Sequence, residues 1–301
     1  PNAPLPGGLV IDPLTGVISG TPTAGVAVPN TRYGVDGTNQ YGASTVRVWI
    51  EVQGPPTNLS YANITQNINT ALPQPVAPTV VSSPSVVQYG ISPALPAGLS
   101  FNTVTGEITG TPTSYTPTAS YTITATNAVG STPVTLPLTV NKRIPSISTL
   151  SNNTKTFGDA SFNIINPTTN STGSFSYVSN NTSVATISGN SVTIVGAGTA
   201  TITATITADA DYDVASTTAT LTVNKAIPTI GTLGSISKTF GDANFNLISP
   251  TSNATGVFSY TSSDSNVVTI TGNTVTIVGA GTATITATQA IDAHYLAGSI
   301  T

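Results

Sequence analysis

The sequence contains no cysteine and no methionine, and only 6% of its 301 residues carry a charge. Without cysteine the chain can form no disulfide and has no thiolate to use as a nucleophile or metal ligand. Soluble proteins are usually about 25% charged, so Ser, Thr, Asn and Gln must keep this surface hydrated. Because even the first residue is not Met, we expect the 301 residues to be part of a longer chain.

Long apolar runs and basic clusters are absent as well. No stretch of 18 consecutive apolar residues occurs, so we expect no membrane span in this segment. The net charge is −4, and the seven basic residues are scattered along the chain. Phosphate binding needs clustered Lys and Arg, and we therefore expect no nucleic-acid partner.

Two kinds of internal repeat, each present twice, organise the chain. Residues from Ile144 onward match those from Ile227 onward at a constant offset of 83, with about three positions in five identical. Both copies contain the stretch VTIVGAGTATITAT. In the first half, LPGGLVIDPLTGVISGTPT from Leu5 matches LPAGLSFNTVTGEITGTPT from Leu95. The offsets predict four domains, which we call modules 1 to 4: residues 1–54, 57–142, 144–225 and 227–301.

The apolar pattern predicts β-strands throughout. In VRVWIEV, alternate residues are apolar and are expected to face inward: Val46, Val48, Ile50 and Val52. In TATITAT, we expect Ala200, Ile202 and Ala204 inside and the threonines outside. Turn residues recur every 8–12 residues or so, as is typical of antiparallel sandwiches. The predicted fold class is all-β, with tandem immunoglobulin-like β-sandwich modules in an elongated array.

Alignment of the copies predicts that both terminal modules are incomplete. Pro1 corresponds to Ile91, so module 1 has no counterpart of residues 57–90. Thr301 corresponds to Thr218, so module 4 has no counterpart of ATLTVNK at residues 219–225. A sandwich without a strand exposes an unpaired edge. Either the sequence is a window on a longer repeat array, or a neighbouring subunit supplies the strand.

The glycines of the repeated stretch predict a bend rather than a nucleotide site. A phosphate-binding loop needs a helix N-terminus after its glycines, whereas Gly196-Ala197-Gly198 leads into alternating β-branched residues. The stretches DPLTG and NTVTG predict hairpin turns. In them, Asp12 or Asn102 bonds to nearby backbone N–H groups and Gly16 or Gly106 adopts a positive φ.

The one cluster of carboxylates is DADYD, which holds Asp209, Asp211 and Asp213. Three carboxylates at alternate positions could supply oxygen ligands to Ca²⁺. The second copy has Asp292-Ala293-His294-Tyr295-Leu296 at the same place, so it loses two of the three. This loss favours a solvated loop. Calcium remains the single candidate cofactor, with these three residues as its metal ligands.

No set of residues suggests catalysis, and we expect that the chain is not an enzyme. The single histidine, His294, has no counterpart in the other copy, and its nearest acidic residue in the sequence is Asp292. The two glutamates, Glu51 and Glu107, lie in different modules and suggest no acid–base pair.

Two further side-chain sets leave alternatives open. An internal isopeptide bond needs a Lys, an Asn and a nearby carboxylate, and Lys155, Asn224 and Asp159 are of these types. The alternative is that Lys155 is exposed and Asp159 caps a turn. Lys238 and Asp242 repeat the first part of this set. The single tryptophan, Trp49, is expected to face outward, where it could stack on a glycan or pack at the junction with module 2.

The motifs carry two resemblances. Modules 1 and 2 share the motif LPxGLxxxxxTGxIxGTPT. This motif resembles GLSFDPATGTISGTPT, the signature of the Ig-like repeats in large bacterial surface proteins. These repeats are similar to dystroglycan-type cadherin-like modules. Modules 3 and 4 resemble bacterial Ig-like group 2 (invasin/intimin-like) repeats of Bacteroidota surface proteins. In module 4 the resemblance is carried by KTFGDANFN, FSYTSS and VTIVGAGTATITA, and module 3 has the same motifs with small changes.

Together the resemblances cover nearly the whole chain and imply a role. They imply a secreted, extracellular, cell-surface protein: a stalk segment of a large repeat adhesin, such as a gliding-motility adhesin, which spaces a distal binding region from the cell. The implied partners are neighbouring Ig-like repeats and the secretion or anchoring machinery. Two other roles remain open: a self-assembling subunit of a filament, sheath or surface layer, and an accessory stalk of a secreted enzyme.

Overall fold

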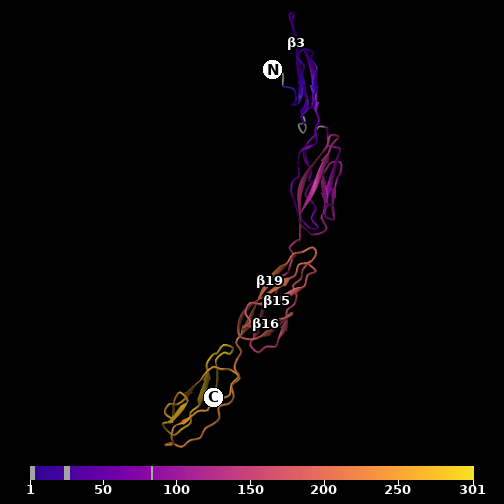
Figure 1. Cartoon of the computed structure of the whole chain (residues 1–301). Coiled ribbons are helices and arrows are strands. Elements are labelled where there is room, and N and C mark those ends of the chain that lie inside the picture. Colours follow the sequence, from indigo (N-terminus) through magenta and orange to yellow (C-terminus); the bar gives the residue numbers. More distant parts are fainter. Residues whose placement is uncertain (1–3, 24–27, 83) are drawn as a thin grey trace. The chain divides into compact units, whose positions relative to one another are not determined.

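The computed structural model describes residues 4–23, 28–82 and 84–301, and its regular elements in these ranges are β-strands (Figure 1). The abundant Thr, Val and Ile, punctuated by Gly and Pro, favour this outcome. The chain divides into two compact units, Pro1–Arg143 with Ala210–Tyr212, and Ile144–Asp209 with Asp213–Thr301. The described ranges contain no helix of the length and apolarity needed to cross a membrane.

Module 1 forms two separate hairpins in the first unit. Their strands are β1 (Leu9–Ile11), β2 (Ile18–Gly20), β3 (Val28–Asn39) and β4 (Gly42–Val52), with β1 paired to β2 and β3 to β4. Along β4, Val52 is buried and Val48 and Ile50 are half-buried, as expected, but Val46 is 63% exposed. The inward prediction for Val46 is wrong because the two-stranded sheet of β3 and β4 offers no further strand to cover it.

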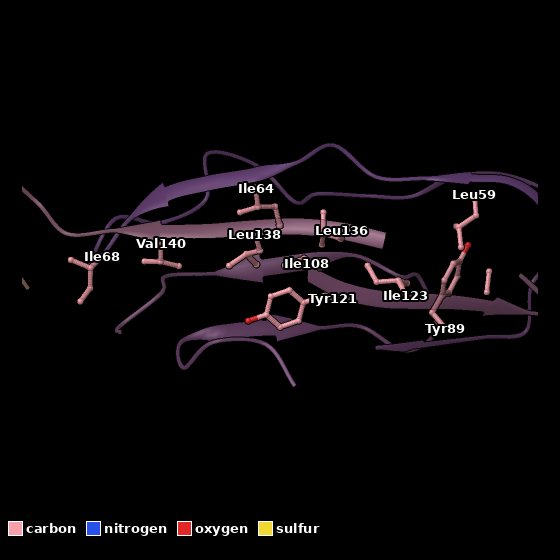
Figure 2. Packing of buried hydrophobic residues seen from close by; sticks show 11 residues of the cluster. Leu59, Ile64, Ile68, Tyr89, Ile108, Tyr121, Ile123, Leu136, Leu138 and Val140 are labelled. Carbon is pink, nitrogen blue, oxygen red and sulfur yellow. The ribbon is translucent and has the colours of Figure 1, made fainter. Parts of the chain in front are cut away.

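Module 2 is a complete sandwich in the same unit. Its strands are β5 (Thr57–Ser60), β6 (Ile64–Asn67), β7 (Thr79–Val81), β8 (Gln88–Ser92), β9 (Leu99–Phe101), β10 (Ile108–Gly110), β11 (Thr116–Thr126) and β12 (Ser131–Asn141). The main sheet has the order β6-β12-β11-β8, and β6 runs parallel to β12. Ile108, Ile123, Leu136 and Leu138 have no exposed surface, and Figure 2 shows them among the strands that enclose the core.

Module 3 repeats this plan in the second unit. Its strands are β13 (Asn153–Thr156), β14 (Phe162–Asn163), β15 (Phe175–Ser179), β16 (Ala185–Ser188), β17 (Ser191–Ile194), β18 (Gly198–Ile206) and β19 (Ala215–Asn224). The two sheets have the orders β13-β19-β18-β15 and β14-β17-β16. Ala200, Ile202 and Ala204 are buried along β18, as predicted, and pack with Leu221 and Val223 of β19.

Module 4 has a smaller set of strands. These are β20 (Phe245–Asn246), β21 (Phe258–Ser262), β22 (Val268–Thr271), β23 (Thr274–Ile277), β24 (Ile285–Gln289) and β25 (Gly298–Ile300). They form sheets of order β20-β23-β22 and β21-β24-β25. The buried core is correspondingly small: Leu247, Tyr260, Val275 and Ala287.

The predicted turns are present. The Asp12 carboxylate accepts hydrogen bonds from the N–H groups of Leu14 and Thr15, and Asn102 accepts the equivalent pair from Val104 and Thr105. Gly16 and Gly106 have φ values of 73° and 76°. These bonds hold the pKa of Asp12 below its usual value, because they stabilise the ionised form.

Candidate functional site at the His294 contact

The predicted calcium ligands lie in three different hydrogen-bonding environments. Asp209 accepts bonds from Ser171 Oγ at 2.8 Å and from Thr172 N and Oγ1 at 2.7 and 2.9 Å. Asp211 accepts one from Asn69 Nδ2 at 3.1 Å, and Asp213 accepts one from Val214 N. Within the described ranges, no three Asp, Glu, His or Cys side chains gather as a metal site would require. A calcium titration still has to test the prediction.

His294, in the loop between β24 and β25, is held by two other segments of the second unit. Its ring stacks on Phe157, with 4.5 Å between the centroids and 16° between the planes. Its Nδ1 accepts a hydrogen bond of 3.2 Å from the N–H of Ala197. We call Phe157, Gly196 and Ala197, which all belong to module 3, the His294 seat. The backbone N–H can only donate, so the bonded ring carries its hydrogen on Nε2.

Glycine at position 196 leaves the space that the imidazole fills. A Cβ built there would lie 2.7 Å from His294 Cε1 and 2.6 Å from the carbonyl oxygen of Ser183. Gly198, at the first position of β18, has a φ of 142°, which favours glycine. The Gly-Ala-Gly therefore carries the chain from β17 in one sheet to β18 in the other, as the predicted bend requires, and also forms the wall of the His294 seat.

Three hydrogen bonds fix the same loop to residues 225 and 226, where module 3 ends and module 4 begins. Ala226 donates its N–H to His294 O at 3.0 Å and accepts the N–H of Leu296 at 2.8 Å. Lys225 Nζ donates to Asp292 O at 2.5 Å. These three bonds hold Lys225 and Ala226 to the loop.

The Asp292 carboxylate holds the backbone of this loop in place through hydrogen bonds. It accepts hydrogen bonds from the backbone N–H groups of Thr255, His294 and Tyr295, at 2.7 to 2.8 Å, and from the hydroxyl of Thr255. These donors, the Thr255 N–H foremost, lower the pKa of Asp292 well below its ordinary value. The ionised carboxylate therefore sets the position of His294, two residues later.

The first copy of the loop makes the corresponding contacts in the first unit. Asp211, which aligns with His294, reaches Asn69, and its carbonyl accepts the N–H of Arg143 at 2.9 Å. Arg143 lies over the ring of Tyr212, with 4.7 Å from Cζ to the ring centroid. In both copies, the residue before the tyrosine makes contacts outside its own loop, with a different side chain in each.

The segment Gly54–Pro56 is fixed in a similar way. The buried side chain of Asn127 donates to Gly54 O at 2.7 Å, and its Oδ1 accepts N–H bonds from Val129 and Gly130. Thr132 Oγ1 bonds to Pro56 O. The sequence analysis predicted neither the bond of Asn127 to Gly54 nor the His294 seat, because the partners in each contact are far apart in sequence. The one signal for the seat was that both copies of the repeat keep the phenylalanine and glycine found at Phe157 and Gly196.

The other predicted side chains have local partners. Trp49 is 62% exposed, as expected, and Arg32 Cζ lies 5.9 Å from its ring centroid. Lys155 Nζ lies 5.0 Å from the ring centroid of Phe162, and Asp159 accepts the N–H of Thr156. Lys238 lies over Phe245 in the same way. The isopeptide bond stays a prediction for intact-mass measurement.

Comparisons with known proteins extend these observations. Residues 1–53 and 55–141 each match the family model described as "Putative Ig domain". No curated protein matches the chain.

Solved structures give weaker likenesses. Mouse protocadherin-24 EC1-3 is 13% identical, with a TM-score of 0.27 over 79% of this chain and 94% of that one. The titin domains Z1Z2, solved in complex with telethonin, are 16% identical, with a TM-score of 0.34 over 57% and 98%. The endo-fucoidan hydrolase MfFcnA4 is 17% identical, with a TM-score of 0.25 over 75% and 38%. The sheets and the two family matches make this chain a tandem array of immunoglobulin-like β-sandwich domains.

Proposed function

We propose that this chain is a non-catalytic spacer in the stalk of a large extracellular adhesin of the cell surface. In this role the modules hold a distal binding region away from the cell and transmit force along the chain. Their partners are the neighbouring repeats and, at the ends of the whole protein, the machinery that secretes and anchors it.

The His294 contact is the observation that carries this proposal. A spacer has to limit bending between its domains, which requires contacts that two domains make with each other in addition to the covalent link. The stack on Phe157, the bond to Ala197 and the bond from Lys225 to Asp292 O are contacts of this kind between modules 3 and 4. The low charge fits a structural role, because few long charged side chains are present to bind ligands.

Single-molecule force spectroscopy tests the proposal on the whole chain. A mechanical array should unfold in discrete steps, each releasing one module of about 80 residues and roughly 280 Å of contour length at about 3.5 Å per residue. Small-angle scattering should give a maximum dimension of roughly 150 Å, as expected for four modules in a row whose strands have about ten residues each. Featureless extension at low force would contradict a load-bearing role. Regular polymers in electron micrographs would favour the filament-subunit alternative.

A further inference from the structure

The hydrogen bond between His294 and module 3 depends on the charge of the imidazole. Nδ1 accepts the N–H of Ala197 at 3.2 Å, and a ring nitrogen can accept only while it carries no hydrogen. In the imidazolium ion both ring nitrogens carry hydrogen, so Nδ1–H would face the Ala197 N–H as a second donor. Two donors cannot bond to each other. Protonation of the ring therefore removes this bond.

The His294 seat leaves the ring little room to avoid this conflict. The stack on Phe157 sets the plane of the imidazole. A Cβ at position 196 would lie 2.7 Å from His294 Cε1 and 3.3 Å from Nδ1, so the ring fits only because this residue is glycine. Nδ1 can leave the Ala197 N–H only if the imidazole turns over or moves out of the stack. Either movement loosens the contact between modules 3 and 4.

The charged neighbours of the imidazole keep their charge around neutral pH. The segments packed around the ring carry five other titratable side chains: Lys155, Asp159, Lys225, Asp292 and Tyr295. Carboxyl, ammonium and phenol groups ordinarily titrate outside the range from pH 5 to pH 8, whereas imidazole titrates within it. The lowered pKa of Asp292, which accepts the backbone N–H of His294 at 2.8 Å, keeps that carboxylate ionised throughout. Residues 180–184 and 191–199, which form the rest of the surroundings, include no titratable residue.

We propose that His294 makes the junction between modules 3 and 4 pH-sensitive: the neutral imidazole restrains the two modules, and the imidazolium releases them. The bonded ring has no hydrogen on Nδ1, so the contact is complete at the upper end of the histidine range and is lost as the pH falls through it. The first copy of the loop has Asp211 at this place and no imidazole, so it lacks this response. Regulation of this kind rests on the proposed spacer function, because both require the His294 contact.

NMR spectroscopy of the whole 301-residue chain tests the proposal, since its single histidine gives a single set of imidazole signals. At pH 8 the ring ¹⁵N shifts should show hydrogen on Nε2 and none on Nδ1. Between pH 8 and pH 5 the amide proton of Ala197 should move upfield together with the imidazole titration. Loss of one hydrogen bond should lower the ratio of closed to open junctions about fivefold. In ¹⁵N relaxation, modules 3 and 4 should then change from tumbling together to tumbling more independently.

His294→Phe is the matched control, because it keeps a ring against Phe157 but has no nitrogen to protonate. Its relaxation should be the same at pH 8 and pH 5. The proposal is overturned by hydrogen on Nδ1 at pH 8, by an Ala197 amide that does not follow the imidazole, or by equal relaxation of the parent at both pH values. An equal pH response in His294→Phe also overturns it.

The same data separate this proposal from the spacer function. If modules 3 and 4 tumble together at both pH values, the spacer function stands and the pH response is wrong. If they already tumble independently at pH 8, the contact restrains nothing, and both proposals are contradicted.

Discussion

The imidazole of His294 lies flat against the ring of Phe157, 4.5 Å away, although the two residues come from different copies of the repeat. Tyr295 meets the same ring edge-on, with 5.5 Å between centroids. One phenylalanine of module 3 thus receives two consecutive ring side chains of module 4. The bond from Ala197 then fixes the rotation of the imidazole within this contact.

Replacing His294 should loosen this contact without unfolding either module. His294→Ala removes the stack, worth about 0.5–1.5 kcal/mol, and the hydrogen bond, worth roughly another 1 kcal/mol. We expect more independent tumbling of modules 3 and 4 in ¹⁵N relaxation measurements, with unchanged core chemical shifts. His294→Phe keeps the stack and loses the acceptor, so it should give an intermediate result. Identical relaxation in all three proteins would show that the contact does not restrain the modules.

Gly196→Ala should be more damaging than an ordinary glycine substitution. The new methyl group would meet the Ser183 carbonyl at 2.6 Å and the imidazole at 2.7 Å, so backbone and ring must both move. We expect a loss of about 1–3 kcal/mol in chemical denaturation, as for other overpacked sites. Gly234→Ala is the control, because a Cβ there meets nothing within 4 Å. Equal effects of the two substitutions would contradict the steric argument.

Acid should weaken the loop that carries His294. The pKa of Asp292 is lowered in the folded chain, so its contribution to stability is complete above the ordinary value of 3.8. The contribution is lost as the pH falls through the lowered pKa of the folded state. Asp292→Asn should be less stable than the parent at pH 7, and the difference should shrink below pH 4. Thermal melts at a series of pH values measure this; a difference that stays constant down to pH 2 would exclude the carboxylate as its source.

A core substitution should affect one module only. Leu221 has no exposed surface and packs in the module 3 core, so Leu221→Ala should cost about 2–5 kcal/mol. In calorimetry, one transition should move to lower temperature while those of the other modules stay in place. Val178→Ala, at a position that is 62% exposed, is the matched control and should move none. A single transition that shifts as a whole would show that the modules unfold together.

Much of the fold could be predicted from local pattern. Alternation along residues 199–205 identified the inward face of β18, and DPLTG and NTVTG identified two turns, because these features depend on neighbours in the sequence. The prediction for Val46 failed since burial depends on what covers a strand, and alternation does not report that. The predicted bend at Gly196–Gly198 was correct, but its second role as a wall for His294 depends on a residue from another repeat.

By itself, the sequence determined the β class, the two repeat types and the lack of thiol chemistry, since composition and periodicity are properties of the chain alone. Only the tertiary structure decided that the lone histidine packs on Phe157 and Ala197. This contact joins segments far apart in sequence, and it exists only because folding brings those segments within contact distance. The repeated Gly-Ala-Gly shows the difference: its sequence predicts a bend, and the fold makes that bend a seat for the next module.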